Sequence, residues 1–548
     1  MERNAMARAI GIDLGTTNSA VAIMGDAGVA EIVPNAEGKP TTPSVVLFKN
    51  SGGDDRTVVG QAARRQASVR PDDVVEYVKR FIGDPSWRFD SSNDNEYRAE
   101  DVSAIILRHL VDAAAERLGE EIRDVVVTVP AYFDDSRRTA TKEAGTIAGL
   151  NVLRVLNEPT AAALAYGVSA ENDGHVLVYD LGGGTFDVTI LGIENRTFEV
   201  LATDGDRNLG GFDWDNELMK LTVAELEQQH GLTDFYDDVE AVAVLRAKAE
   251  LAKRALSASE RATIELALDS GDYRIEVTRE QFEEATSSLL RRTQEIVEDT
   301  LDESGLDWDD IDQVLLVGGS TRMPAVHDLV RRLSGRAAAD GVNPDEVVAL
   351  GAAIQAVLTT RNESAAPLGD VRVHDVTSHA LGTTVFDVDE ERKVNAVIIP
   401  RNTKIPASGE QELFHDNPVT QVSIDLTQGD DPDPEFVTTI GESTIELDEE
   451  WPAGTRFRLV YSYDVDQTVH VEIFRLPSGE SAGAFAIERV ANMTQDEIVA
   501  SATKVRSVVT GSAAPSAPQA KPVSGPVIPT AAPASADAAA SASTAQRG

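Results

Sequence analysis

The stretch VLVYDLGGGTFDVTIL, residues 176–191, decides the fold because it places an aspartate and three glycines between two runs with the pattern of β-strands. A second stretch, AIGIDLGTTNSAVAIM at residues 9–24, repeats this arrangement of apolar strand, aspartate, glycine-containing turn and alternating strand. In a Walker loop or a Rossmann turn a helix would follow the glycines, and the sequence has no GK[ST] motif. We therefore predict two β-hairpins that carry Asp13 and Asp180 near their tips.

The residues at these two tips suit a polyphosphate that carries a metal ion. Glycine lets backbone N–H groups approach phosphate oxygens, and the neighbouring threonines add hydroxyl donors. An aspartate at each strand end can hold a hydrated Mg²⁺, which takes few carboxylates together with water and phosphate. Because the motif occurs twice, we predict two similar subdomains whose hairpins face each other across a cleft.

The composition excludes several classes of protein. The chain has 548 residues, 42% of them hydrophobic, no cysteine and a formal net charge of −43. Its length favours two to four domains, and no apolar run approaches the ~18 residues that span a bilayer. The negative charge disfavours nucleic-acid and anionic membrane partners, and the absence of cysteine excludes disulfides. The start of the chain lacks the apolar core of a signal peptide, so we expect a cytoplasmic protein.

The pattern of residue types changes three times along the chain. Up to about residue 362, short β-branched runs alternate with helical stretches, as in an α/β fold, and one long acidic helical segment runs from Asp213 to about Ser257. Short alternating strands follow, and then one amphipathic helix that Thr494 caps. The end of the chain is rich in Ala, Pro and Ser and is expected to be disordered. The predicted segments are an α/β domain (1–366), a linker (367–376), a β-domain (377–492), a short helix (493–510) and a tail (511–548).

A third glycine pair occurs in VLLVGGSTRMP, residues 314–324, where a strand runs into the glycines and Pro324 opens a helix. A helix start with free N–H groups beside a guanidinium suits the sugar or base of a nucleotide. Six motifs now stand in a fixed order along the chain: GIDLGTTNS (11–19), VPAYF (129–133), NEPTAAALAYG (157–167), DLGGGTFDV (180–188), LVGGSTRMP (316–324) and NPDEVVALGAA (343–353). This set resembles the heat shock protein 70 family of DnaK-type chaperones, closely over residues 8 to about 360 and loosely over 375–490.

The resemblance implies an actin-like (RNase H-like) ATPase domain of two paired lobes, followed by a β-sandwich that binds extended peptides. It implies an ATP-dependent molecular chaperone that hydrolyses ATP to ADP and phosphate, with ATP, Mg²⁺ and also K⁺ as cofactors. Unfolded polypeptides are the expected clients, and a J-domain co-chaperone and a nucleotide exchange factor are the expected partners. Neither nucleic acid nor a membrane is expected as a partner.

The resemblance also assigns roles in the nucleotide site. Asp13 and Asp180 would orient Mg²⁺ through water, and Lys79 matches the catalytic lysine of the family, although by residue type alone it reads as a solvated helix lysine. The other residues with an expected catalytic role are Glu158, Thr185 and Asp187. The residues expected to bind the nucleotide are Thr16, Thr17, Asn18, Gly182, Gly183, Gly184, Gly211, Glu250, Lys253, Arg254, Ser257, Gly318, Gly319, Ser320, Arg322 and Asp345.

Communication between the domains is expected to depend on Pro130, Arg138 and Asp375, which match family positions. Family linkers carry aliphatic residues before the aspartate, whereas here Arg372 and His374 replace two of them. Because alternate residues of an extended segment face opposite ways, we expect Val371 and Val373 to pack on the nucleotide domain while Arg372 and His374 stay exposed to solvent. Burial of Arg372 needs an acidic partner, so docking of the linker is expected to be salt-sensitive. His327 and the other histidines match no family position and are expected at the surface.

The expected peptide pocket consists of Val385, Phe386, Phe414, Val422 and Ile424, although alternating apolar residues in any sandwich also face a core. The helix at 493–510 would be a truncated lid, so the chain is expected to be a divergent member without the full helical lid of the family. Two alternatives remain: an ATP-dependent regulatory protein with one dedicated client, and a small-molecule phosphotransferase of the same fold. The β-domain argues against the phosphotransferase, and also against a filament-forming actin relative.

Overall fold

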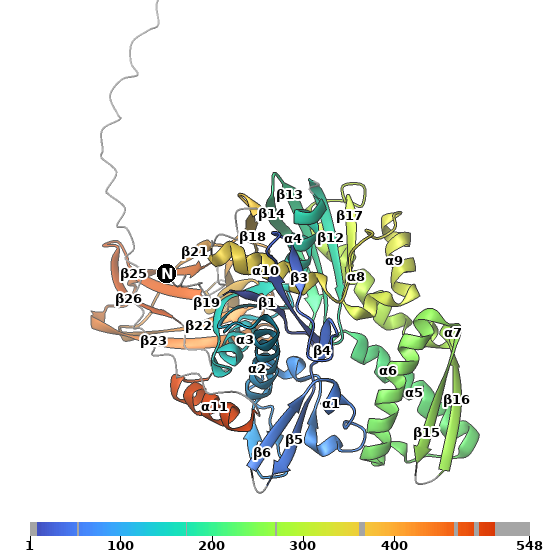
Figure 1. Cartoon of the computed structure of the whole chain (residues 1–548). Coiled ribbons are helices and arrows are strands. Elements are labelled where there is room, and N and C mark those ends of the chain that lie inside the picture. Colours follow the sequence, from blue (N-terminus) through green and yellow to red (C-terminus); the bar gives the residue numbers. More distant parts are fainter. Residues whose placement is uncertain are drawn as a thin grey trace, which may run out of the picture. The chain divides into compact units, whose positions relative to one another are not determined.

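The computed structural model describes residues 8–51, 54–170, 173–268, 271–360, 368–388, 390–464, 469–486 and 493–509. The predicted disorder of the tail lies outside these residues, as does the start of the predicted linker. Within them, two α/β lobes precede two antiparallel sheets and one short helix (Figure 1). No helix in this part of the chain combines the length and the apolar character needed to cross a membrane.

The first lobe, residues 8–157, is built on a mixed sheet with the strand order β11-β10-β1-β2-β3, and β4 pairs with β2. β1 is antiparallel to β2 and parallel to β10, so the first predicted hairpin is confirmed. The side chain of Asp134 caps α3 by accepting a hydrogen bond from the N–H of Arg137. The elements are β1 (Ile10–Asp13), β2 (Asn18–Met24), β3 (Ala30–Ile32), β4 (Thr41–Pro43), β10 (Asp124–Val129), β11 (Asn151–Asn157), α2 (Ala99–Leu118) and α3 (Asp135–Ile147).

The second lobe repeats this plan with the strand order β17-β12-β13-β14-β18. β12 and β13 form an antiparallel hairpin, and β12 runs parallel to β17, as β1 does to β10. The second predicted hairpin is therefore confirmed, and so is the internal repeat. These strands are β12 (Gly174–Leu181), β13 (Phe186–Glu194), β14 (Thr197–Asp206), β17 (Gln313–Val317) and β18 (Arg372–His374).

Two helices join the lobes. α4 (Glu158–Ala170) and α10 (Val347–Thr360) pack on each other, and α10 also lies against β1 and β2. A Cβ atom at Gly351 would lie 1.8 Å from the carbonyl oxygen of Ala161, so the two helix backbones come together where only glycine fits. The residues around this crossing form one apolar core with strands of both lobes. The helix pair therefore fixes the floor of the space between the hairpin tips.

Each lobe also carries an outer subdomain, which lies across the space between the hairpin tips from the helices α4 and α10. In the first lobe its elements are β5 (Val46–Ser51), β6 (Asp54–Val59), α1 (Gln61–Arg64), η1 (Pro71–Asp73), β7 (Val74–Val75), η2 (Val78–Phe81), β8 (Phe89–Asp90) and β9 (Glu96–Tyr97). In the second they are α5 (Gly211–His230), η3 (Phe235–Asp237), α6 (Val239–Ala258), β15 (Arg261–Leu268), β16 (Gly271–Thr278) and α7 (Arg279–Ala285). The next helix, α8 (Ser287–Ser304), packs on β13 and β14 of the central sheet, and η4 (Gly319–Arg322) and α9 (Pro324–Ser334) follow β17. The predicted acidic helical segment is thus two helices, because the chain turns at Gly231 with φ of 70°.

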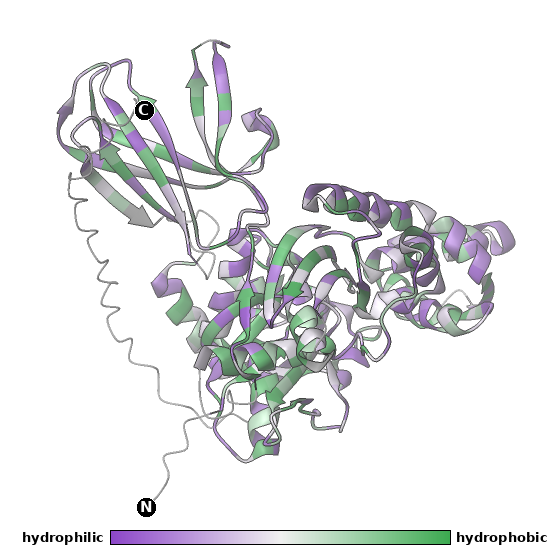
Figure 2. Cartoon of the chain, turned by 90° about the horizontal axis from the view of Figure 1, so that it is seen from above, coloured by the Kyte–Doolittle hydropathy of each residue, from purple (hydrophilic) through white to green (hydrophobic). Residues whose placement is uncertain are grey.

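The β-domain is a sandwich of two four-stranded antiparallel sheets, β20-β19-β22-β23 and β21-β24-β25-β26. Leu459, Tyr461 and Ile473 are almost fully buried between the sheets, and hydropathy alternates along the strands (Figure 2). The elements are β19 (Leu381–Asp387), β20 (Arg392–Ile399), β21 (Ala407–Phe414), β22 (Val419–Gln428), η6 (Pro434–Phe436), β23 (Thr438–Trp451), β24 (Arg456–Tyr463), β25 (Val469–Arg475) and β26 (Glu480–Ala486).

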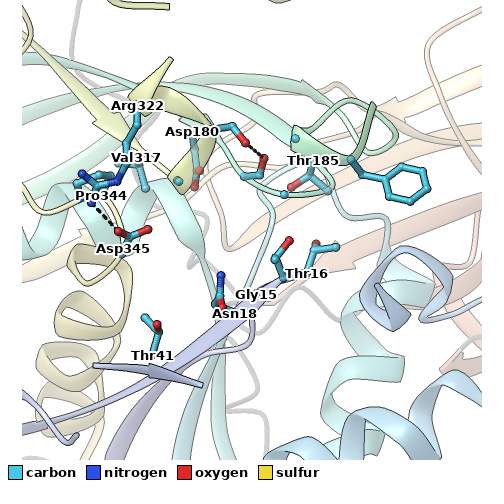
Figure 3. Close-up of a pocket in the computed structure, with 18 of the residues that line it drawn as sticks. Gly15, Thr16, Asn18, Thr41, Asp180, Thr185, Val317, Arg322, Pro344 and Asp345 are labelled. Carbon is cyan, nitrogen blue, oxygen red and sulfur yellow. Dashed lines mark hydrogen bonds and ion pairs between the residues drawn. The ribbon is translucent and has the colours of Figure 1, made fainter. Parts of the chain in front are cut away.

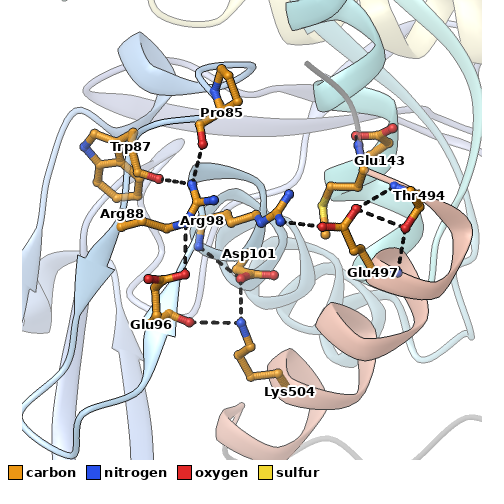
Figure 4. A network of polar contacts seen from close by, with 11 residues as sticks. Pro85, Trp87, Arg88, Glu96, Arg98, Asp101, Glu143, Thr494, Glu497 and Lys504 are labelled. Carbon is orange, nitrogen blue, oxygen red and sulfur yellow. Dashed lines mark hydrogen bonds and ion pairs between the residues drawn. The ribbon is translucent and has the colours of Figure 1, made fainter. Parts of the chain in front are cut away.

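The last described helix, α11 (Gln495–Val508), begins at the predicted cap, where Thr494 and Glu497 form a capping box. Its apolar face lies in the core of the first lobe, next to α2, α3 and β6, rather than over the sandwich as a lid would. Arg98 pairs with Glu497, and the ammonium of Lys504 lies 3.0 Å from the fully buried carboxylate of Asp101 (Figure 4). The truncated lid of the sequence analysis therefore contacts the first lobe in this structure.

Removal of the Lys504 ammonium should loosen α11. The variant Lys504→Ala leaves the Asp101 carboxylate buried without its cation, which costs about 1–3 kcal/mol. Because about 1.4 kcal/mol corresponds to a tenfold change in an equilibrium, amide hydrogen exchange across residues 495–508 should be roughly tenfold faster than in the wild type. The control is Arg506→Ala, since this side chain is exposed on the same helix. Equal exchange in all three proteins would contradict the role given to the Lys504–Asp101 pair.

Candidate nucleotide site

A cavity of about 430 Å³ lies between the two lobes. Both hairpin tips line it, together with residues of η2, α4, α5, α6 and η4. Figure 3 shows Thr16 and Asn18 from the first tip opposite Asp180 and Thr185 from the second, with Arg322 and Asp345 at another end. Of the expected catalytic, metal and nucleotide residues, all except Gly184 and Asp187 line this cavity.

The two hairpin tips touch each other at the glycine run. A Cβ atom on Gly183 would lie 2.0 Å from the hydroxyl oxygen of Thr17, so a larger residue cannot occupy this position without displacing the opposite tip. Gly184 is enclosed on two sides, because a Cβ atom on it would lie 2.7 Å from Cγ2 of Thr16 in the first tip, and a Cβ atom on Gly210 would lie 2.5 Å from its nitrogen. The N–H of Gly182 donates to the carbonyl of Thr185 and closes the turn. The predicted pair of facing hairpins is thus observed.

Buried carboxylates dominate the end of the cavity at the two hairpin tips. Lys79 is 5% exposed and forms an ion pair with Glu158. Burial and the nearby charge of Glu158 together raise the pKa of Asp13 to about 7. The pKa of Asp180 is raised by the same two causes. The single positive charge of Lys79 does not neutralise these carboxylates when they are ionised, so a divalent cation would be attracted to this end of the cavity.

Asp187 lies beside this cluster rather than on the cavity wall. Its Oδ1 accepts a hydrogen bond of 2.8 Å from the backbone N–H of Tyr132, and its buried Oδ2 has no protein partner among the described residues. Burial and the charge of Glu158 raise the pKa of Asp187 to about 7. An orphaned carboxylate oxygen next to two further acids fits a hydrated cation that a few carboxylates hold through water.

Basic side chains gather at the opposite end of the cavity. Lys253 donates to the carbonyl of Gly211 at 2.6 Å and pairs with Asp215 at 2.9 Å. Arg322 pairs with Asp345 at 2.5 Å, close to the start of α9. Ser320, in the same turn, donates to the carbonyl of Gly182 at 2.8 Å and so ties this end to the second hairpin tip. The third glycine motif therefore lies at the same cavity as the two hairpins.

The three residues expected to link the domains lie at one junction. Arg138 donates to the carbonyl of Ala131 at 2.8 Å and to the hydroxyl of Ser378 at 3.3 Å. Ser378 itself donates to the same carbonyl at 2.5 Å. Pro130 directly precedes this carbonyl, and Asp375 accepts a hydrogen bond of 2.8 Å from Asn157, the last residue of β11 in the first lobe. Burial raises the pKa of the Asp375 carboxyl.

The linker forms strand β18, which extends the sheet of the second lobe by pairing in parallel with β14. Val373 packs against the apolar core that the lobes share, as the alternation predicts. Arg372 is exposed, and its guanidinium pairs with Asp370 at 2.7 Å. The acidic partner of Arg372 is thus part of the linker, and the charge of Arg372 stays exposed when the strand docks.

The five peptide-pocket candidates do not form one enclosed pocket. Val422 and Ile424 are 1% and 6% exposed in the sandwich core, whereas the rings of Phe386 and Phe414 are 60% and 53% exposed. Val385 is half-buried. On β21 it is Leu413 rather than Phe414 that packs against the core. The assignment of these residues to peptide binding stays a prediction.

The structure also brings forward residues that the sequence analysis missed. Tyr77, Phe212 and Asp215 line the cavity, but in the sequence they read as an ordinary aromatic or acidic residue beside a motif. His327 is exposed, as expected. The expectation for His379 is wrong: its ring lies 4.4 Å from that of Tyr132, and burial lowers the pKa of His379 to about 4.

Comparison with known proteins now identifies the family. The sequence model described as "Hsp70 protein" matches residues 9–92 and 84–500. The chain belongs to the Hsp70 family. It is 41% identical over 498 residues to the chaperone protein DnaK of Mycoplasmopsis synoviae, with 89% of this chain and 80% of that protein covered. The DnaK of Metamycoplasma hominis is 43% identical over 469 residues, covering 83% and 75%, and that of Thermus thermophilus is 40% identical over 527 residues, covering 90% and 82%.

This Hsp70 chain is an ATP-dependent molecular chaperone and an ATPase, with the actin-like lobes and β-sandwich expected from its motifs. Its cofactor is ATP, with Mg²⁺ as is general in the family, and its clients are unfolded polypeptides. The arrangement of residues around Lys79 can now be tested.

Replacement of Lys79 should stop hydrolysis and spare binding. We expect Lys79→Ala to bind ATP but to hydrolyse it at least about 100-fold more slowly in a single turnover, the scale of losing one preorganised charge. Lys142→Ala is the matched control, because Lys142 is exposed on α3 of the same lobe. Single-turnover hydrolysis of Lys79→Ala near the wild-type rate would remove Lys79 from the mechanism.

Proposed function

We propose that this chain hydrolyses ATP around Lys79 and that hydrolysis controls how the sandwich holds exposed hydrophobic peptide segments. The observation that carries the proposal is a buried lysine together with three acids, Asp13, Glu158 and Asp180, in a cavity that both lobes line. The ammonium of Lys79 would stabilise negative charge on the transferred phosphoryl group and orient the attacking water. Glu158 would hold the ammonium in place, and Thr185 would lie next to the terminal phosphate.

The carboxylates would hold the metal ion. Asp13 ends β1 and Asp180 is the second-last residue of β12, which are the corresponding strands of the two hairpins. Asp187 adds an oxygen that has no protein partner among the described residues. When bound, Mg²⁺ neutralises phosphate charge and orients the phosphate chain. The basic residues at the other end of the cavity, with Gly319 and Ser320, would hold the adenosine.

We further propose that linker docking couples the two activities. β18 joins the sheet that carries Asp180 and Asp187, and the next residue, Asp375, is hydrogen-bonded to Asn157, which directly precedes α4. A J-domain co-chaperone, a nucleotide exchange factor and bound K⁺ stay predictions from the family resemblance. The domain limits and a cytoplasmic address stay predictions from the sequence pattern. The alternative of one dedicated client predicts stimulation by that client and not by unfolded polypeptides in general.

The function is tested by ATP turnover with and without an unfolded polypeptide, in the presence of a J-domain protein. We expect several different unfolded polypeptides to raise turnover, because the proposed groove recognises main chain and an apolar side chain rather than one sequence. The release rate of a fluorescent peptide should differ between the ATP and ADP states. Turnover that no unfolded polypeptide changes, with one release rate in both states, would contradict the proposal.

Substitution of the buried side of the linker should uncouple the two activities. Val373→Asp places a charge in the shared core, at a cost of several kcal/mol unless the strand undocks, so peptide-stimulated turnover should fall to the basal rate. Arg372→Leu is the matched control on the wet side. Because the exposed Arg372–Asp370 pair contributes only about 0–1 kcal/mol, this variant should keep its stimulation and its small dependence on salt. Loss of stimulation in both variants, or in neither, would contradict the role of the buried side.

A further inference from the structure

Phe212, near the start of α5, is contacted by three side chains. The guanidinium carbon of Arg80 lies 4.7 Å from the centroid of its ring, and that of Arg246 lies 4.4 Å away. The ring of Tyr77 meets it edge-on, with 4.9 Å between centroids and 65° between the planes. Cation–π and edge-to-face aromatic pairs are both attractive at these distances.

These contacts cross from one lobe to the other. Tyr77 and Arg80 belong to the first lobe, on either side of Lys79 in the sequence, whereas Phe212 and Arg246 belong to the second. Arg80 also donates to the carbonyl of Asn208 at 3.1 Å and pairs with Asp213 at 3.4 Å. The ring of Phe212 therefore lies under a side chain that the opposite lobe supplies.

The same residues are part of the cavity wall. Both Tyr77 and Phe212 line the cavity, and the N–H of Phe212 donates to the carbonyl of Gly183 in the second hairpin tip at 2.8 Å. Tyr77 has a φ of 58°, a left-handed conformation that non-glycine residues rarely adopt, and it directly precedes η2. The surrounding contacts must hold this backbone in place.

We infer that Tyr77, Arg80 and Phe212 form an inter-lobe clasp that sets how long ADP stays bound. This inference rests on the proposed nucleotide site. A nucleotide in a cavity between two lobes leaves when the lobes separate, and separation breaks the contacts of Phe212 with Tyr77 and Arg80. The clasp therefore slows release without contributing a group to the chemical step. The ion pair between Arg64 of α1 and Glu250 of α6 also crosses between the lobes, so loss of the clasp alone should weaken closure rather than abolish it.

The test is the dissociation of a fluorescent ADP analogue, chased with excess ATP in a stopped-flow instrument. We expect dissociation about tenfold faster in Phe212→Ala, since an aromatic pair and a cation–π contact are lost together. Phe212→Leu, which keeps an apolar side chain without a π face, should also release faster. Tyr77→Ala combined with Phe212→Ala should add much less than the product of the single effects, because both remove the same contact.

Tyr236→Ala is the matched control. This aromatic residue lies in η3 of the second lobe, is 54% exposed, and has its ring contact with Phe235 of the same lobe. Release at the wild-type rate in Phe212→Ala, or multiplicative effects in the double variant, would overturn the clasp. Faster release in Phe212→Ala alone, with a lower unfolding temperature of the nucleotide-free protein and normal release in Phe212→Leu, would assign Phe212 to packing and overturn it as well.

The wild type separates this inference from the proposed site. If the wild-type chain does not bind the analogue, the nucleotide site itself is wrong and the clasp falls with it. If the wild type binds the analogue and the Phe212 variants release it normally, the nucleotide site stands and the clasp alone is refuted.

Discussion

The close crossing of α4 and α10 is the constraint on which the rest of the structure depends. At this point the backbone of Gly351 meets the carbonyl of Ala161, and any side chain there would force the helices apart. The two helices share one apolar core with both central sheets. Because that core fixes the distance between the sheets, it also fixes where the hairpin tips meet, and with them the acids around Lys79. The chemistry of the cavity is thus set by packing outside it.

The parts of the fold that motifs encode could be predicted from the sequence. The paired hairpins, the third glycine motif and the capped helix at Thr494 each rest on local rules that hold without tertiary information. Lys79 is the instructive case, because its residue type indicates a solvated side chain and only the family motif indicated a role in the site. In the structure Lys79 is only 5% exposed, and its charge is compensated by Glu158, which lies 79 positions further along the chain.

The remaining features depend on contacts that one sequence does not contain. An amphipathic helix does not specify the surface that it covers, so nothing in its pattern directed α11 to the first lobe. The register of a strand is likewise not specified by the local pattern, and a shift by one residue exchanges the two faces of the strand. This is why Leu413 and not Phe414 faces the sandwich core. Phe212 follows two glycines at a helix start and would pass for ordinary packing until Arg80 is seen above its ring.

One peptide group joins the cavity to the sandwich. The N–H of Tyr132 is bonded to Asp187, and the carbonyl of the same planar unit, which belongs to Ala131, accepts hydrogen bonds from Ser378 and Arg138. A trans peptide does not twist about its central bond at any ordinary cost, and its N–H and C=O point in opposite directions. A rotation of the peptide plane therefore moves the N–H and the C=O together, in opposite directions. Asp187 beside the cavity and Ser378 before the sandwich are thus hydrogen-bonded to the same rigid peptide group.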